Sequence, residues 1–95
     1  MQDDSFEWDD TKATTNRRRH GIDFALATLT FDDAFAVDRL DDRMDYGEER
    51  NILIGRCRDM ILHVTWTQRG ERVRIISARR AERHEQQDYH RQNSR

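Results

Sequence analysis

The chain is predicted to form a small α+β domain: a short N-terminal strand, two helices, an antiparallel sheet ending in a meander, and a C-terminal helix. Three observations predict this class. Helix start and stop signals mark the N-terminal part, apolar and polar residues alternate in the C-terminal part, and short turn sequences separate the last strands. The 95 residues contain no proline and no repeat, so residues 1–95 are expected to form one domain with a modest core.

The N-terminal part is expected to contain a short strand at residues 5–8 and a helix over about residues 10–20. Asp9 or Asp10 can cap this helix, and Gly21 is a typical stop signal. A single alanine is the only apolar residue of the helix, so an apolar stripe of its own cannot hold it in place.

The rest of the chain is expected to alternate between sheet and helix. Asp23 can cap a second helix over residues 24–29, whose apolar residues suit docking on a sheet. A final helix is expected over about residues 78–91. Between these helices, alternation predicts four strands, of which the last three form an antiparallel meander, at residues 34–40, 49–58, 60–67 and 72–77.

Alternation also assigns side chains of the last two strands to two faces. Leu62, Val64 and Trp66 share one face of their strand, and Val73 and Ile75 share one face of the next. The opposite face carries histidine, threonine and arginine side chains. Two interpretations stay open for that polar face: simple exposure to solvent, or the floor of a groove for RNA.

The formal net charge of −2 conceals a polarity along the chain. Residues 1–49 hold six Lys or Arg and fourteen Asp or Glu, a balance of −8, whereas residues 50–95 hold eleven Arg and five Asp or Glu, a balance of +6. A basic half can bind a polyanion, and an acidic half can repel it or hold a basic partner. The alternative is an ordinary surface of mixed charge.

Several classes of protein are disfavoured by composition. No apolar run approaches the ~20 residues of a membrane span, and the acidic N-terminus lacks an apolar signal region. Cys57 is the single cysteine, so no internal disulfide forms and a reducing, cytoplasmic setting is expected. His63, His84 and His90 match no compact ligand spacing, and no phosphate loop is present, so neither metal nor cofactor is expected.

Arginines crowd the junction between the last predicted strand and the last predicted helix. If Ser77 is the N-cap, Arg79 and Arg80 fall in the first helical turn, where each cation costs roughly 0.3–1 kcal/mol. A bound anion would compensate, because free N–H groups, the helix dipole and two guanidiniums together suit a phosphate. We therefore expect a phosphate site at this junction.

A second group of polar residues lies on the first predicted helix. Lys12, Asn16 and His20 are four residues apart, so they line one face, with Arg19 beside them. This stripe predicts either the wall of a polar groove or a solvated helix face, and His20 alone can shuttle a proton near neutral pH. Further along, Glu49 opens a strand and could serve as a general base, orient an arginine or form a structural ion pair.

Segments between about residues 6 and 89 occur in a characteristic order. They are Phe6-Glu7-Trp8-Asp9, then Lys12, Asn16, Arg19-His20-Gly21 and Phe24, then Glu48-Glu49-Arg50 with Ile54-Gly55, then Thr67-x-Arg69-Gly70, and finally Arg74-Ile75-Ile76-Ser77-Ala78-Arg79-Arg80-Ala81 followed by Glu85 and Tyr89. Together they resemble the BrnT toxins of bacterial type II toxin–antitoxin systems, which have a RelE-like ribonuclease fold. The chain departs from that family's usual Asp-Pro at Asp33-Ala34, and from its common lysines at Arg19 and Arg80.

The resemblance implies a small endoribonuclease that needs no metal, blocks translation and arrests growth. It also implies a BrnA-like antitoxin that binds the toxin and represses the shared operon, and a dimer or heterotetramer assembled through that partner is left open. RNA supplies its own nucleophile, the 2′-OH beside the scissile phosphate. The protein then has to remove a proton, stabilise the extra negative charge on phosphorus and assist the leaving oxygen.

The expected catalytic residues supply charge stabilisation or proton transfer, and they are Arg79, Arg80, Arg69, His20 and Glu49. Arg69 is the doubtful member, because its turn and the arginine junction lie at opposite ends of one strand, ~25 Å apart. The expected RNA-binding residues are Lys12, Asn16, Arg19, Arg50, Arg72 and Arg74. Two alternatives stay open: a non-catalytic RNA- or protein-binding module of the same fold, and an arginine junction that only docks an acidic segment of the antitoxin.

Overall fold

The computed structural model describes residues 1–41 and 47–93 and confirms the α+β class. Five strands form one sheet in the order β1-β5-β4-β3-β2, in which β1 runs parallel to β5 and the other neighbours are antiparallel. The elements in chain order are β1 (Phe6–Glu7), α1 (Asp10–His20), α2 (Phe24–Ala27), the 3₁₀ helix η1 (Thr28–Asp32), β2 (Val37–Asp41), β3 (Arg50–Cys57), β4 (Met60–Arg69), β5 (Arg72–Arg80) and α3 (Arg83–Asn93).

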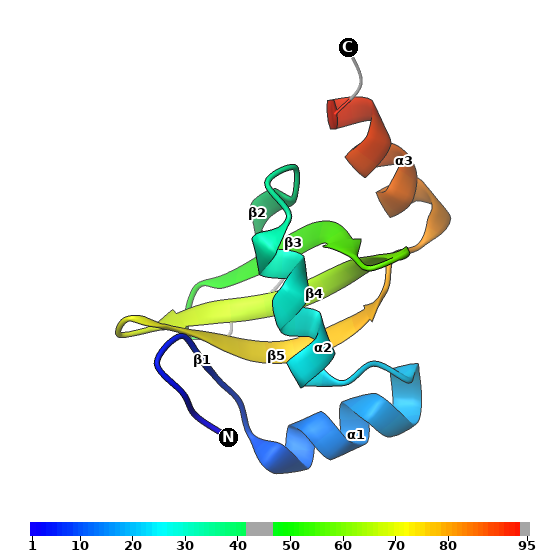
Figure 1. Ribbon diagram of the computed structural model, residues 1–95. Coiled ribbons are helices and arrows are strands. Elements are labelled where there is room, and N and C mark those ends of the chain that lie inside the picture. Colours follow the sequence, from blue (N-terminus) through cyan, green and yellow to red (C-terminus); the bar gives the residue numbers. More distant parts are fainter. Residues whose placement is uncertain (42–46, 94–95) are drawn as a thin grey trace.

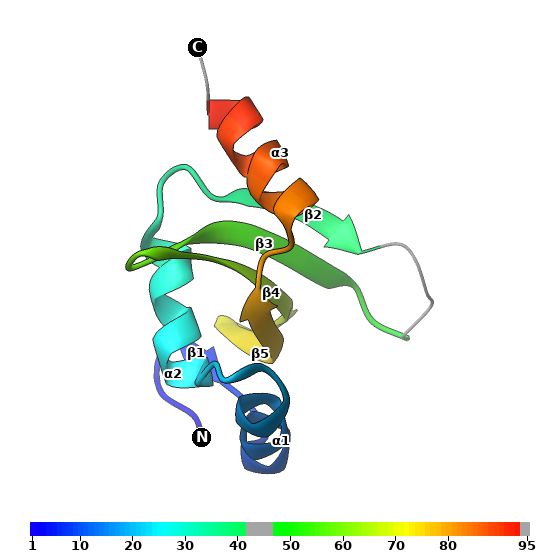
Figure 2. The same cartoon turned by 90° about the vertical axis from the view of Figure 1, so that its right-hand side faces the viewer.

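The helices lie on both sides of the sheet (Figures 1 and 2). On one face, the α2 residue Phe24 packs with Leu62, Val64 and Ile75, all nearly or fully buried, in the main core. This face is the apolar one that alternation predicted. No helix within residues 1–41 and 47–93 is long and apolar enough to cross a membrane.

The opposite face carries a second, smaller core beneath α3. The isoleucines of β3 and β4, including Ile54 and Ile61, are buried there with Tyr89 of α3. The Tyr89 hydroxyl donates a hydrogen bond to Asp33 Oδ2 at 2.7 Å, which ties α3 to the segment before β2. This face is therefore covered at one end, rather than solvent-exposed along its full length.

Helix α1 begins and ends at the predicted residues, and an amide side chain replaces the missing apolar stripe. Asp9 accepts a hydrogen bond from the Lys12 N–H at 3.0 Å, and Gly21 has the left-handed φ of 72° that ends the helix. The buried Asn16 side chain donates to the Ala78 carbonyl at 2.8 Å and accepts from the Ala78 N–H at 3.1 Å. These two bonds fasten α1 to the edge of β5.

The prediction for residues 78–91 is wrong at its start. Strand β5 continues to Arg80, and α3 begins at Arg83, so Ser77 is no N-cap and Arg79 and Arg80 occupy no helical turn. The reason is non-local: β4 extends from Met60 to Arg69 and offers paired backbone to β5 through Arg80. The argument from an unfavourable helix dipole therefore falls, although the crowding of arginines stays.

Two other boundaries also differ from the predictions. The second helix was expected over residues 24–29 but ends at Ala27, after which the chain tightens into η1. The strand expected from residue 34 begins at Val37, because the Asp33 carboxylate and carbonyl accept the N–H groups of the next residues and hold them in a turn.

Candidate active site and RNA-binding face

One face of the β4–β5 hairpin is polar along most of its length, opposite the main core. Directly opposed residues in antiparallel strands share a face, so the register identifies its members. We call this surface the arginine face. Its cross-strand pairs, starting from the end near α3, are His63 with Arg79, Thr65 with Ser77, Thr67 with Arg74, and Arg69 with Arg72.

A β-bulge makes this grouping possible. Trp66 pairs with Ile75 and Thr65 pairs with Ser77, so Ile76 is an extra residue without an opposed partner. Strict alternation from Ile75 would turn Ser77 and Arg79 toward the main core. The extra residue reverses the phase, so that Ala78 is fully buried in the core and Arg79 shares the polar face of Arg74.

Arg79 is held by a carboxylate of α3. Its Nη1 and Nη2 donate to Glu85 Oε1 and Oε2 at 2.8 and 3.1 Å, and Nη1 also donates to the Arg80 carbonyl. The Glu85 side chain is 6% exposed, and its Oε2 lies 3.6 Å from His63 Nε2. Burial opposes ionisation of Glu85, but hydrogen bonds from Arg79 and the Glu82 N–H, with the nearby positive charge, lower its pKa.

The far end of the arginine face is neutralised from within the protein. Glu48 lies 3.5 Å from Arg69 and 3.7 Å from Arg50. Arg74 pairs with Glu7 of β1 at 2.5 Å, and Arg72 donates to the Asp3 carbonyl at 2.6 Å. Three of these arginines were predicted to bind RNA, and Arg69 was predicted to be catalytic. Their contacts also hold the N-terminal strand and the start of β3 in place.

Glu49 lies at this far end as well. Its carbonyl oxygen accepts a hydrogen bond from Thr67 Oγ1 at 2.6 Å, and its side chain is exposed. Along β4, Thr67 lies four residues from His63, the residue that pairs with Arg79. Glu49 and Arg69 thus lie away from Arg79, as the hairpin geometry predicted for Arg69.

The predicted site residues of α1 line a pocket beside β5. This α1 pocket has a volume of about 230 Å³ and lies between α1 and the bulged part of β5. Lys12, Arg19 and His20 are exposed on its wall. Neither Lys12 nor Arg19 forms an ion pair with a carboxylate of the described residues. Its lining residues are Thr11, Lys12, Thr15, Asn16, Arg19, His20, Ile76 and Ser77.

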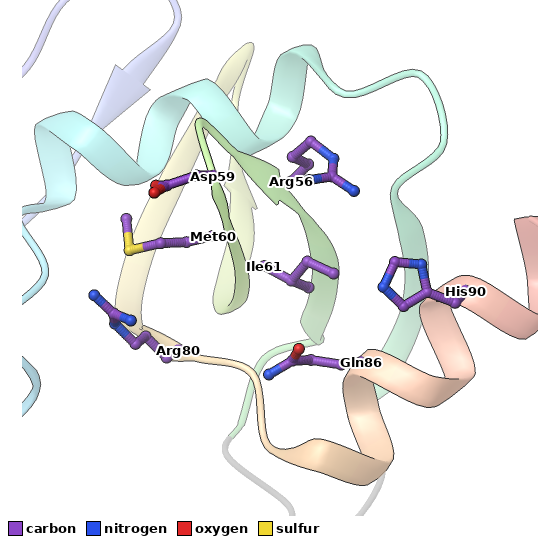
Figure 3. Close-up of a pocket in the computed structure, with 7 residues that line it drawn as sticks. All are labelled: Arg56, Asp59, Met60, Ile61, Arg80, Gln86 and His90. Carbon is purple, nitrogen blue, oxygen red and sulfur yellow. The ribbon is translucent and has the colours of Figure 1, made fainter.

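Arg80 is separated from Arg79 and opens onto a different pocket, which we call the hairpin pocket (Figure 3). Consecutive strand residues point to opposite faces, so the two guanidiniums are not brought to one point. The hairpin pocket has a volume of about 260 Å³ and lies between the β3–β4 turn and α3. Its lining residues are Arg56, Asp59, Met60, Ile61, Arg80, Gln86 and His90.

Comparison with known families assigns the chain. Residues 8–85 match the family model described as the ribonuclease toxin BrnT of type II toxin–antitoxin systems. The chain belongs to the BrnT family. A comparison with curated proteins gives no match.

The BrnT assignment makes the arginine face, the α1 pocket and the hairpin pocket candidate RNA-binding surfaces of a ribonuclease toxin. The family is described as a ribonuclease toxin, which implies an RNA substrate, and as part of a type II toxin–antitoxin system, which implies an antitoxin partner. Within the residues that the structure describes, no group of three His, Cys, Asp or Glu side chains is arranged to hold a metal ion. The candidate site of this BrnT-family chain contains cations, hydroxyls and imidazoles together with the Glu85 carboxylate.

Sequence reasoning missed Glu85, which anchors Arg79 in this BrnT fold, and the position of His63 beside it. Glu85 appeared only among the residues of the family resemblance, and His63 was considered as part of the polar face and as a metal ligand. Their proximity depends on α3 folding back over β4, so no spacing within the sequence could reveal it. A carboxylate six residues beyond an arginine was the only signal available.

Proposed function

We propose that residues 1–95 act as a single toxin domain that cleaves RNA without a metal ion and thereby inhibits translation. The RNA is proposed to lie across the arginine face, with its scissile phosphate near Ser77. A BrnA-like antitoxin is the proposed partner that neutralises the activity. Membership of the BrnT family supports the substrate class and the existence of a partner.

One observation carries the proposed position of the site. Ser77 belongs both to the arginine face and to the wall of the α1 pocket. Along β5 it lies two residues from Arg79, roughly 7 Å at the rise of a strand, and across the pocket it faces the helix that bears His20. A proton acceptor and a guanidinium therefore flank the same hydroxyl, as cleavage by the 2′-OH requires.

The proposed reaction uses RNA's own hydroxyl as the nucleophile. His20 accepts the 2′-OH proton while the 2′-oxygen bonds to phosphorus, and the P–O5′ bond breaks as that oxygen takes a proton from water. The products are a 2′,3′-cyclic phosphate and a 5′-hydroxyl end. Arg79 stabilises the extra negative charge on phosphorus, because its bonds to Glu85 and Arg80 use three of the five guanidinium N–H donors.

The other predicted residues take supporting roles in this proposal. Lys12 and Arg19, on the α1 pocket, attract flanking phosphates, whereas Asn16 positions α1 through its bonds to Ala78. Glu49 is the weaker candidate for the proton acceptor because it lies at the far end of the arginine face. The paired arginines at that end, Arg50, Arg69, Arg72 and Arg74, add positive potential and hold the scaffold.

The test is RNA cleavage by the purified protein in EDTA and in Mg²⁺. We expect equal cleavage in both buffers, cyclic phosphate ends, and a loss of about 10²–10⁴-fold in rate for His20→Gln. Glu49→Gln, the matched change at the far end, should stay within about threefold of wild type. Loss of activity in EDTA, or full activity of His20→Gln, would contradict the proposal.

One observation favours a second candidate, a non-catalytic RNA-binding module. Glu85 already neutralises Arg79, which reduces the net charge that this guanidinium offers to a phosphate. In that case RNA would bind to the wild-type protein and stay intact in both buffers. Binding and integrity of the RNA, followed in the same samples, separate the two candidates.

A further inference from the structure

The hairpin pocket holds two arginines, of which Arg80 has no carboxylate partner among residues 1–41 and 47–93. Arg56 and Arg80 form no ion pair within 4.0 Å among residues 1–41 and 47–93. The Arg80 side chain is exposed, and Arg56 lies beside the Tyr89 hydroxyl. The Asp33 carboxylate offsets part of the Arg56 charge. The exposed Arg80 guanidinium is therefore the group of this pocket that most favours an anionic ligand.

The remaining lining residues narrow the class of ligand. Met60 and Ile61 give the pocket an apolar patch, and the Gln86 Nε2 donates to the Ala81 carbonyl at 3.0 Å, which fixes the amide group. Figure 3 shows the Gln86 amide near Ile61 and the His90 ring on the side of the opening away from Arg80. Apolar contact, an amide and an imidazole suit a nucleobase, whereas guanidiniums suit its phosphate.

The size of the pocket supports one nucleotide rather than several. Its volume of about 260 Å³ is below the ~300–1,000 Å³ typical of pockets for drug-sized ligands. Asp59, the one carboxylate of the lining, opposes a second phosphate and offers an acceptor to a ribose hydroxyl or a base amine. An extended acidic peptide would bring several carboxylates past Asp59 and fits this mixture less well.

The pocket adjoins the proposed reaction site through the backbone itself. Arg79 and Arg80 are consecutive, so their Cα atoms are about 3.8 Å apart although their side chains diverge. An RNA strand with its scissile phosphate near Arg79 can therefore place a neighbouring nucleotide at Arg80. We propose that the hairpin pocket binds one nucleotide next to the scissile phosphate, with Arg80 on its phosphate and the apolar and amide groups of the pocket on its base. This inference rests on the proposed function.

The test measures binding of 5′-mononucleotides (AMP, GMP, CMP and UMP) to the full chain, by calorimetry and by backbone amide shifts. We expect at least one of them to bind more tightly than inorganic phosphate and to shift the amides of Met60, Ile61 and Gln86. Arg80→Gln should weaken this binding about tenfold or more. Arg58→Gln is the matched control, since Arg58 is exposed in the same turn but does not line the pocket.

Several outcomes would overturn the inference. They are equal binding of phosphate and mononucleotides, unchanged binding by Arg80→Gln, and tighter binding of an Asp- and Glu-rich peptide at the same amides. Thermal unfolding of each variant shows that loss of binding is not loss of the fold. Cleavage of RNA is scored separately: His20→Gln should keep mononucleotide binding, and mononucleotide binding by a wild type that cleaves no RNA would contradict the proposed function instead.

Discussion

The far end of the arginine face and the two pockets beyond its near end differ in how their cations are used. At the far end, Arg69 and Arg74 contact the carboxylates of Glu48 and Glu7. Toward α1 and the β3–β4 turn, cations such as Lys12 and Arg80 have no carboxylate partner in the described part of the chain. The number of basic residues in a segment therefore does not give its capacity for RNA, since some of them are already neutralised by the fold.

Arg79 is paired with a carboxylate and is also the guanidinium proposed to act on the scissile phosphate, which makes Glu85 the most informative residue to change. Glu85→Gln should lower the free energy of unfolding by roughly 3 kcal/mol, because it removes a buried charge that the Arg79 guanidinium and the Glu82 N–H both contact. Urea denaturation measures the effect. Glu82→Gln, at a side chain that is 63% exposed, should change stability by less than about 0.5 kcal/mol. Similar losses for the two variants would remove the distinction between buried and exposed partners.

The same carboxylate predicts sensitivity to acid. The pKa values of Glu85 and Asp33 are both lowered, since hydrogen bonds to their ionised forms outweigh the opposing effect of burial. In acid, the unfolded chain therefore binds more protons than the folded chain. The stability that Glu85 and Asp33 contribute is complete above their ordinary pKa values, 4.5 and 3.8.

The free energy of unfolding should then fall as pH drops below about 4.5, through the range in which these carboxylates become protonated. Denaturation at a series of pH values measures this decline. In Glu85→Gln the slope should be smaller, because one of the groups no longer titrates. A profile that is flat from pH 6 to pH 3 would show that neither carboxylate stabilises the folded state.

The smallest expected effects compare one arginine from each group. Arg74→Gln breaks the contact with Glu7 and should lower stability by about 1 kcal/mol while leaving most RNA affinity intact. Arg19→Gln should leave stability unchanged and reduce the slope of log affinity against log salt by about 1. Filter binding at several salt concentrations, with denaturation of the same samples, measures both. Exchanged outcomes would invert the assignment of structural and RNA-binding arginines.

Sequence patterns predicted local features well and non-local ones poorly. The cap at Asp9 and the stop at Gly21 were readable because each depends on a few adjacent residues. The end of β5 was not, because residues up to Arg80 stay in a strand only through pairing with β4. Asn16 was placed on one face of α1 with Lys12 and His20, but its hydrogen bonds to Ala78 could not be read, since the two residues are 62 positions apart.

The candidate site shows the same division. The sequence nominated His20, Lys12 and Arg19 as one wall, and the structure places all three on the α1 pocket. It grouped Arg79 with Arg80, which strand geometry separates into two sites. What could not be foreseen was the packing of α3 onto β4, which joins His63 to Glu85.

The bulge at Ile76 has a consequence for how this chain tolerates change. Side chains along a strand alternate between the two faces of the sheet, so one extra residue changes the face of every later residue in that strand. If Ile76 were paired in a regular ladder, inside and outside would be exchanged, with the Arg79 guanidinium entering the main core and Ala78 entering the site, whereas deleting Ile76 would leave Ser77, Ala78 and Arg79 on their present faces. The chemistry of the site is thus encoded by a count of residues as much as by their identities.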